Sequence, residues 1–179
     1  MKQQLQNVDG SIGRDKKDVV RDVRSIIEAA GYTVVETNDQ KPWGAYFRFD
    51  GAEADRFVEE FFPGLSAEEA RLGDPVAELS PKILLVAPSQ RLSWQFHHRR
   101  AERWAYLTRG AYNKSTTDEP GDALVATPGD VVQFVRSERH RLIGDDQAWT
   151  VVAEIWQHSD PANPSDEDDI VRLEDDYSR

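Results

Sequence analysis

The apolar positions of this chain follow a helical period near its start and a strand period further along. Between residues 15 and 31, valine, isoleucine and alanine recur at helical spacing, with Asp15 placed to cap the helix start and Gly31 its end. Strands are predicted over residues 32–37 and 45–49, because both runs are rich in β-branched and aromatic residues and the turn-forming sequence NDQKPWG separates them. The chain therefore opens with a helix and two strands.

Residues 51–80 interrupt the strand pattern with helical periodicity. The run AEADRFVEEFF predicts a helix that Pro63 and Gly64 end. A second, short helix follows, with Ser66 as N-cap and Glu69 at the capping-box position. We interpret this segment as a helical insertion.

From Lys82 onward the pattern changes to short strands punctuated by glycine, proline, aspartate and serine. The expected strands are KILLVA, RLSWQFHH, ERWAYLTR, AYNKS, ALVAT, VVQFV, HRLIG and WTVVAEIWQH. Eight short strands at this spacing indicate a mainly β fold, either a barrel or a double-sheet sandwich.

The expected organisation is one domain with extensions, which suits 179 residues. Residues 1–40 form an N-terminal extension, whose first 13 residues we expect to be frayed. Residues 41–160 form the barrel, and residues 161–179 form an acidic loop and a C-terminal strap with IVRLE as a last strand.

Charge and composition exclude several classes of function. The net charge of −11 repels phosphate backbones and anionic headgroups, so we expect neither nucleic acid nor a membrane as partner. The chain has no cysteine, which rules out disulfides and thiol catalysis. The start lacks the apolar stretch of a secretory signal, and we expect a cytoplasmic protein.

The richest chemistry lies in SWQFHHRRAERW, residues 93–104. Alternate side chains of a strand share a face, so Gln95 and His97 should point the same way, about 7 Å apart. Glu102 breaks this alternation, which predicts a bend within residues 98–101 that swings the Glu102 strand beside the first. Past a further strand and turn, His140 can reach the same interior point of a closed barrel. Such a mixed set of nitrogen and oxygen donors suits Zn, Mn, Fe, Co or Ni.

These residues also carry a family resemblance. The order Gln-x-His-x4-Glu, a Gly-Asp turn at Gly129 and Asp130, and then His140 resembles the two metal-binding motifs of the cupin superfamily. KPWGAYFRF, KILLVAPSQRLSWQFHHRRAERW, HRL, AEIWQ and DEDDIVRLEDDYSR resemble the isomerase domain of type II phosphomannose isomerases. The resemblance implies a cupin-type double-stranded β-helix, a jelly-roll barrel, with an N-terminal helix and a short inserted helical segment.

By this resemblance, the metal ligands are Gln95, His97, Glu102 and His140. The resemblance also gives Arg100 a catalytic role and implies one divalent metal, with zinc expected first. The chain departs from the cupin pattern before the last histidine, where Val135, Arg136 and Ser137 replace a Pro-x-Gly turn, and at Gly144, where an asparagine is common. Bifunctional relatives also carry a sugar-nucleotide pyrophosphorylase domain, for which this sequence has no room, so we expect no nucleotidyl transfer.

An aldose–ketose isomerase needs a base beside the α-carbon and a group that polarises the carbonyl. Glu154, on the inner face of a late strand, is the first candidate for the base, and His98 and Glu102 remain alternatives. The candidates for holding a substrate phosphate are Lys82, Arg136, Arg139 and Arg141.

The expected function is metal-dependent interconversion of mannose 6-phosphate and fructose 6-phosphate, by a homodimer. Two other functions fit the same residues. His97, His140 and Glu102 also satisfy the two-histidine, one-carboxylate triad of an Fe(II) oxygenase. A non-catalytic cupin that binds a sugar would use the same fold.

Overall fold

The computed structural model describes residues 1–177 of the 179-residue chain. Its helical elements are α1 (Lys2–Gln6), α2 (Lys16–Ala29), a 3-10 turn (Gly51–Glu53), α3 (Ala54–Phe61) and α4 (Ala67–Ala70). Its strands are β1 (Val34–Asn38), β2 (Gly44–Phe49), β3 (Leu79–Val86), β4 (Trp94–Phe96), β5 (Arg100–Tyr106), β6 (Gly110–Ser115), β7 (Leu124–Ala126), β8 (Val131–Phe134), β9 (Arg139–Gly144), β10 (Thr150–His158) and β11 (Val171–Glu174).

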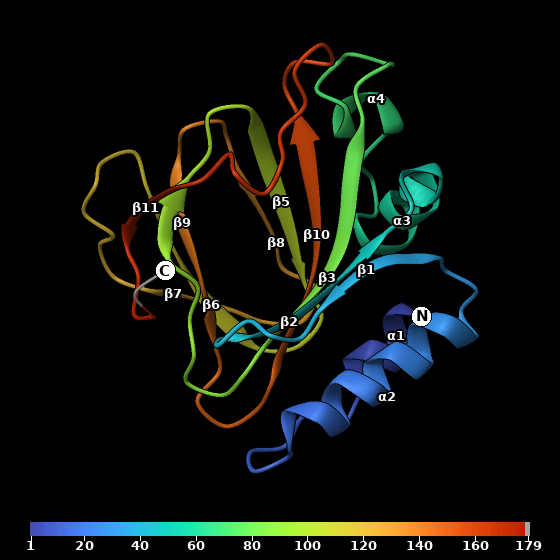
Figure 1. The fold of residues 1–179 in the computed structure, drawn as a ribbon, viewed down its shortest axis with the longest axis vertical. Helices are drawn as coiled ribbons and strands as arrows, with labels where there is room; N and C mark the ends of the chain where they lie inside the picture. Colours follow the sequence, from blue (N-terminus) through green and yellow to red (C-terminus); the bar gives the residue numbers. More distant parts are fainter. Residues whose placement is uncertain (178–179) are drawn as a thin grey trace.

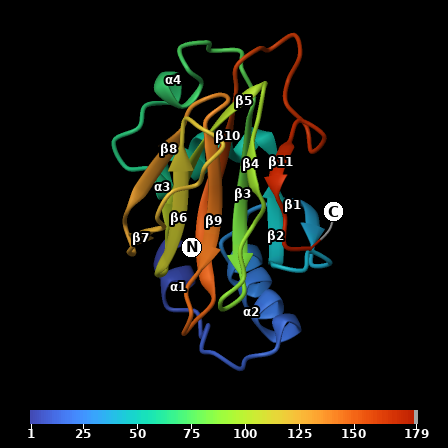
Figure 2. The same ribbon diagram turned by 90° about the vertical axis from the view of Figure 1, so that its left-hand side faces the viewer.

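The strands form two antiparallel sheets that face each other across a common interior (Figure 1). In the described residues, the large sheet has the order β1-β2-β3-β10-β5-β8 and the small sheet has the order β11-β4-β9-β6-β7. Figure 2 looks onto the small sheet, with β9 at its centre. The predicted fold class is confirmed: the protein is mainly β, and its paired sheets form a cupin-type barrel.

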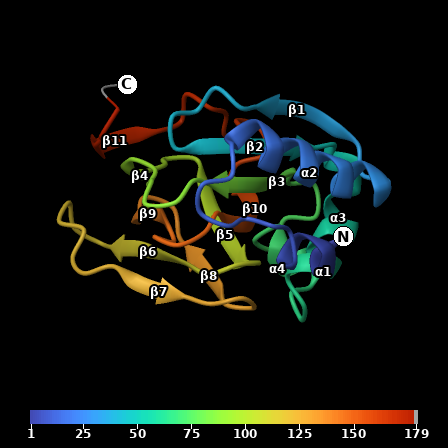
Figure 3. The same cartoon turned by 90° about the horizontal axis from the view of Figure 1, so that it is seen from below.

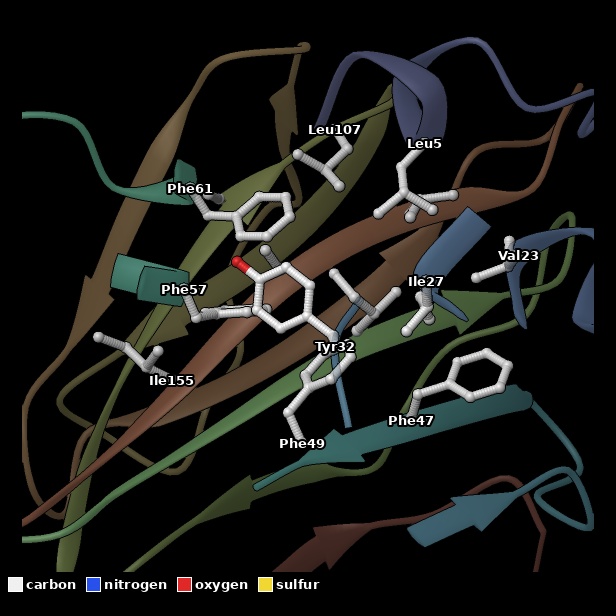
Figure 4. Close-up of a cluster of buried hydrophobic side chains, with 14 of the residues drawn as sticks. Leu5, Val23, Ile27, Tyr32, Phe47, Phe49, Phe57, Phe61, Leu107 and Ile155 are labelled. Atoms are coloured by element: carbon white, nitrogen blue, oxygen red, sulfur yellow. The ribbon is translucent and has the colours of Figure 1, made fainter. Parts of the chain in front are cut away.

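All the helices lie against the outer face of the large sheet, where α2 runs beneath β2 and β3 (Figures 1 and 3). Side chains at alternate positions of the sheet pack against them, including Phe47, Ile83 and Ile155. Figure 4 shows this cluster, in which Tyr32, Phe49 and Phe57 contact one another by their rings. Among the described helices, none combines the length and the apolar character needed to cross a membrane.

The other face of the large sheet lines the interior of the barrel. Here the alternate positions hold Tyr46, Leu84, Trp104 and Val152, which form a second apolar cluster with residues of the small sheet. Because both faces are covered, every residue of β10 is buried. The same inner face continues into a polar region that contains Lys82, Glu102 and Glu154, and this region is where the site lies.

Several boundaries differ from the prediction. The first 13 residues are not simply frayed, because α1 inserts Leu5 into the outer apolar cluster. β3 begins at Leu79, before the predicted start at Lys82, which places Lys82 inside a strand between two buried neighbours. The predicted capping box of Ser66 and Glu69 is present at α4. Ser178 and Arg179, the end of the expected strap, lie outside the described residues.

Candidate metal centre and pocket

The candidate ligands come from both sheets. Gln95 on β4 and His140 on β9 are directly paired neighbours in the small sheet, and His97 follows the end of β4. Glu102 lies on β5, which belongs to the large sheet. The predicted bend is present, but it does not place the Glu102 strand beside β4 as we expected. It carries the chain across the barrel, so that Glu102 faces the two histidines from the opposite sheet.

Asp169, on the segment between β10 and β11, holds the bend at which the chain crosses. Its carboxylate oxygens accept the backbone N–H groups of His98 and Arg99, at 2.9 and 3.0 Å. These are the two residues of the bend, and Asp169 is itself only 5% exposed. The buried carboxylate accepts hydrogen bonds from two backbone N–H groups. It therefore fixes the turn at a point where, within residues 1–177, no neighbouring strand supplies hydrogen bonds.

The three side chains His97, Glu102 and His140 meet at one buried point. His97 Nε2 lies 3.1 Å from Glu102 Oε1, and His140 Nε2 lies 3.3 Å from Glu102 Oε2. All three residues are at most 2% exposed. One ligand atom from each lies within 4.8 Å of the others, a spacing that can hold a metal ion.

Backbone carbonyls set the tautomer of both histidines. His97 Nδ1 lies 2.6 Å from the carbonyl oxygen of Asp169, and His140 Nδ1 lies 2.9 Å from that of Glu138. Each Nδ1 therefore donates a proton to its carbonyl, and in the neutral imidazole this leaves the lone pair of Nε2 directed toward Glu102. Burial lowers the pKa of His97, although the negative charge of Glu102 acts in the opposite direction. The lowered pKa favours the neutral imidazole that metals bind.

This arrangement fits a cation. Glu102 Oε2 and His140 Nε2 are buried, and among the described residues neither has a hydrogen-bond partner. Burial by itself would raise the pKa of Glu102, but His97, His140 and Arg100 hold it well below its usual value, so the carboxylate is ionised. Converging lone pairs without a proton between them are costly unless a positive ion lies among them. The donor set, two imidazoles and a carboxylate, suits zinc and other divalent transition metals.

Gln95 is close to this point, but its amide nitrogen faces the histidine and its amide oxygen is turned away. Its Oε1 accepts a hydrogen bond from Ser93 Oγ at 2.6 Å, and its Nε2 lies 3.4 Å from His97 Nε2. A metal ligand must offer the amide oxygen, so Gln95 would join the set only after its amide turned by 180°.

Arg100 is held at the edge of the same point. Its Nε donates to Glu102 Oε1 at 2.8 Å, and its Nη2 lies 3.2 Å from His97 Nε2. Its Nη1 donates to Ser165 Oγ at 2.8 Å, and the guanidinium lies 3.5 Å from the ring centre of Trp156. Arg100 therefore donates to two atoms that a bound ion would also need, and the two cations compete for them.

A pocket that opens to solvent adjoins the candidate metal centre. Glu102 and Gln95 form part of its wall, and so do Lys82 and Glu154, which are neighbours in the β3–β10 ladder and share the inner face of the large sheet with Glu102. The pocket wall carries four cations and three carboxylates, namely Lys41, Lys82, Arg100, Arg172, Glu102, Glu154 and Glu167. The cationic residues of the pocket wall outnumber its carboxylates. The sign of the charge in the pocket is therefore opposite to that of the chain, whose net charge is −11.

Glu154 is poised between charged and neutral forms. Burial, together with the charge of Glu102, raises its pKa to about 8, despite the opposing effects of Lys82 and Arg100. Trp104 Nε1 donates to Glu154 Oε1 at 2.9 Å and fixes the orientation of the carboxyl group. A carboxyl group held in place with a pKa near neutrality is suited to taking up and returning a proton.

The structure brings Lys82 to the pocket, but not the three arginines predicted with it. Arg139 pairs with Asp118 at 2.7 Å, and Arg141 pairs with Glu174 at 2.9 Å. Within residues 1–177, neither these two nor Arg136 is part of the pocket wall. Strand alternation explains Arg139 and Arg141, because they flank His140 and point away from the interior. Their phosphate-binding role is therefore unsupported, and Lys41 and Arg172 are the further cations that line the pocket.

The turn before His140 is kept without its usual residues. Ser137 has φ +65°, in the left-handed region that glycine normally supplies. Ser137 N–H donates to the carbonyl of His97 at 2.9 Å, and Glu138 N–H donates to that of Val135 at 3.0 Å. These two hydrogen bonds hold the turn that precedes β9, on which His140 lies.

The sequence reasoning missed Asp169, which it treated as part of a solvated acidic loop. Besides fixing the bend, Asp169 accepts a hydrogen bond from Ser165 Oγ at 2.6 Å, and its carbonyl orients His97. The available signal was the run DEDDIVRLEDDYSR, whose resemblance to the isomerases extends beyond the ligands themselves.

Replacing Asp169 by alanine should weaken divalent-ion binding by about 10- to 100-fold, because outer partners orient metal ligands. Ion affinity is measured by titration of the metal-free protein, and circular dichroism reports whether the fold is kept. Asp168→Ala is the matched control, since Asp168 is exposed and next in sequence. Equal affinity in both variants would remove Asp169 from the support of the site.

Comparison with known proteins finds relatives of the sequence but no matching family profile. No protein-family profile matches the chain. Over 168 residues, which is 93% of the chain, it is 29% identical to the xanthan biosynthesis protein XanB from two strains of Xanthomonas campestris pv. campestris. The chain spans 29% of the length of these curated relatives.

Two solved structures that resemble the chain each match about half of it. A Cupin 2 conserved barrel domain protein from Salinispora arenicola is 20% identical, with a TM-score of 0.39, and covers 45% of this chain and 64% of its own. A proposed sugar phosphate isomerase from Acidithiobacillus ferrooxidans is 19% identical, with a TM-score of 0.40, and covers 49% of this chain and 64% of its own. With scores this low, the fold assignment rests on the strand topology of the chain itself.

Proposed function

We propose that the protein is a metal-dependent aldose–ketose isomerase that acts on a sugar phosphate, with mannose 6-phosphate and fructose 6-phosphate as the first pair to test. One observation carries the proposal. A buried His-Glu-His group that can hold a metal ion adjoins a pocket that is also lined by a carboxyl group, Glu154, and a buried ammonium group, Lys82.

The residues of the chain suit the two parts of this reaction. Glu154 would take the proton from C2 of the aldose and return it to C1, while the hydroxyl proton moves from O2 to O1. This breaks the C2–H and O2–H bonds and forms the C1–H and O1–H bonds, so the reaction needs no oxidant or reductant. A divalent ion held by His97, Glu102 and His140 would stabilise the negative charge that develops on the substrate oxygens.

The curated relatives support a role on sugars, because they are described as xanthan biosynthesis proteins. That similarity is spread over nearly the whole chain. The matched part is, however, less than a third of those relatives, so the activity of this chain has to be measured directly.

The decisive experiment is an assay under nitrogen. The purified protein, with its bound metal determined, is incubated with mannose 6-phosphate, and fructose 6-phosphate is measured. Turnover without oxygen supports the isomerase. Oxygen consumption by the iron-loaded protein would point to an oxygenase, and bound metal with no turnover of any hexose phosphate would point to a sugar-binding protein.

Replacing Arg100 by alanine should lower kcat by about 100- to 1000-fold while the ion stays bound, because one charged donor beside the developing negative charge is removed. Ion affinity should be equal or higher, since Arg100 competes for His97 Nε2 and Glu102 Oε1. Metal content and kcat are measured on the same preparation. Arg99→Ala is the control, because Arg99 is adjacent and pairs with Asp166 outside the pocket. Full activity of Arg100→Ala would remove Arg100 from catalysis.

A further inference from the structure

Lys82 is a buried cation whose salt bridge comes from a surface loop. Its side chain is 3% exposed, and its Nζ lies 2.7 Å from Oε1 of Glu167, whose own side chain is 51% exposed. The ammonium also lies 3.2 Å from the ring centre of Trp156 and 5.0 Å from that of Tyr46. A buried ammonium on two aromatic faces is a strong, directed anion site.

Of the two groups in this salt bridge, the Glu167 side chain is the one that can move away. Half of its side chain is already in water, so the Glu167 carboxylate can leave Lys82 and become fully hydrated without being buried elsewhere. The loop is anchored before and after Glu167: Asp166 pairs with Arg99 at 2.9 Å, and Asp169, two residues further on, is buried beneath the bend. The Glu167 side chain can therefore swing outward by rotation while the backbone of the loop stays in place.

Neighbouring anions favour the charged form of Lys82. Burial lowers its pKa, and the charges of Glu154 and Glu167 oppose that effect. An incoming anion that displaces Glu167 would have to supply the same compensation. A phosphate monoester does so, with about two negative charges and three acceptor oxygens in place of one charge and two oxygens.

We propose that Lys82, framed by Trp156 and Tyr46, is the subsite for the phosphate group of the substrate, and that the Glu167 carboxylate occupies this subsite until phosphate displaces it. The inference deepens the proposed function, on which it rests for the identity of the substrate. Glu167 then acts as a built-in competitor, which excludes neutral sugars and weak anions because only a stronger anion recovers the lost salt bridge. The apparent affinity for phosphate is reduced by the fraction of time that Glu167 spends on Lys82.

The test is binding of inorganic phosphate to the full chain, measured by isothermal titration. Glu167→Gln should tighten phosphate binding roughly tenfold, because the competing charge is gone. The control is Glu174→Gln, which removes a carboxylate of equal exposure that pairs with Arg141 outside the pocket, and should leave binding unchanged. If Glu167→Gln binds phosphate equally or more weakly, the carboxylate is not a competitor and the inference is wrong.

A double-mutant cycle identifies Lys82 as the shared partner. In a Lys82→Gln background phosphate binding should be lost, or weak and insensitive to Glu167→Gln. If Glu167→Gln still tightens binding there, phosphate binds elsewhere and the subsite is not at Lys82. If Lys82→Gln does not fold, two results with Glu167→Gln take its place. This variant should bind phosphate more tightly than the natural protein, and mannose 6-phosphate, but not mannose, should compete with the bound phosphate. Failure of either result would overturn the proposed subsite. Phosphate binding is independent of turnover, so an inactive protein that passes these tests refutes the isomerase but keeps the anion subsite.

Discussion

Replacement of Glu102 by glutamine should abolish binding of one divalent ion per chain and, with it, isomerase turnover. Glu102 is the residue that both histidines face, at 3.1 and 3.3 Å, and its charge is the one negative charge among the three ligands. Ion affinity should fall by more than the roughly 10- to 100-fold expected for an outer partner, because a direct ligand is lost. The glutamine amide can donate to His140 Nε2, so the fold can accept the change.

Two measurements test this result. Addition of zinc should raise the melting temperature of the natural protein, since the folded state alone presents the assembled site, and it should leave that of Glu102→Gln unchanged. Glu174→Gln, which removes the carboxylate that pairs with Arg141 outside the pocket, should respond to zinc like the natural protein. Undiminished zinc stabilisation of Glu102→Gln would show that the ion binds somewhere other than between the two sheets.

Replacement of Glu154 by glutamine should lower kcat by about 100- to 10,000-fold while the metal stays bound. The change keeps the acceptor for Trp104 Nε1, which lies 2.9 Å from Glu154 Oε1, so the shape of the pocket is retained and the ability to accept a proton is lost. Rapid-mixing kinetics and metal analysis of the same sample separate the two effects. If Glu154→Gln remained active, Glu154 would not be the base. Of the two alternatives, Glu102 would then be the better candidate, because His98 is exposed.

The same residue sets the expected pH dependence. Glu154 acts as a base only when ionised, and its pKa in the metal-free protein is about 8, so kcat/KM should rise with pH below that value and then level off. A bound divalent ion favours the carboxylate and should move the midpoint to lower pH. Glu154→Gln should remove this limb of the profile, and an unchanged limb would mean that another group titrates.

The raised pKa of Glu154 also makes the free energy of unfolding of the metal-free protein depend on pH. The folded-state value of about 8 is above the ordinary value of 4.5, so the folded protein keeps a proton between these two values. The stability contributed by Glu154 is therefore present below pH 4.5 and is lost as the pH rises through 8. Relative to Glu154→Gln, the natural protein should lose free energy of unfolding across this window, as denaturant melts at successive pH values would show.

The strands of the barrel could be predicted from the sequence because their signal is local. Alternating apolar residues, turn-forming punctuation and the capping box at Ser66 each act within a few residues, and the structure shows the corresponding elements. The chemistry of the site was also local in part, since two donors at i and i+2 of one strand share a face whatever surrounds them. His97 and Gln95 accordingly lie side by side.

The sequence could not place the partners that come from distant segments. Nothing local distinguishes the buried Asp169 from the exposed Asp168, and both are acidic residues of one loop. Nor does strand alternation show which sheet a strand joins, which is why β5 was expected beside β4. Arg141 and Lys82 likewise look equivalent as lone cations within strands, yet one pairs outside the pocket and the other lies inside it.

By itself, the sequence determined a mainly β chain and a donor set of two histidines and a carboxylate, since periodicity and residue type are properties of short stretches. Only the tertiary structure decided that Glu102 meets the histidines from the opposite sheet, that Lys82 and Glu154 share their pocket, and that Glu167 reaches in from the tail. The reason is that burial and pairing between charges depend on segments far apart in the chain, which only the closed barrel brings together.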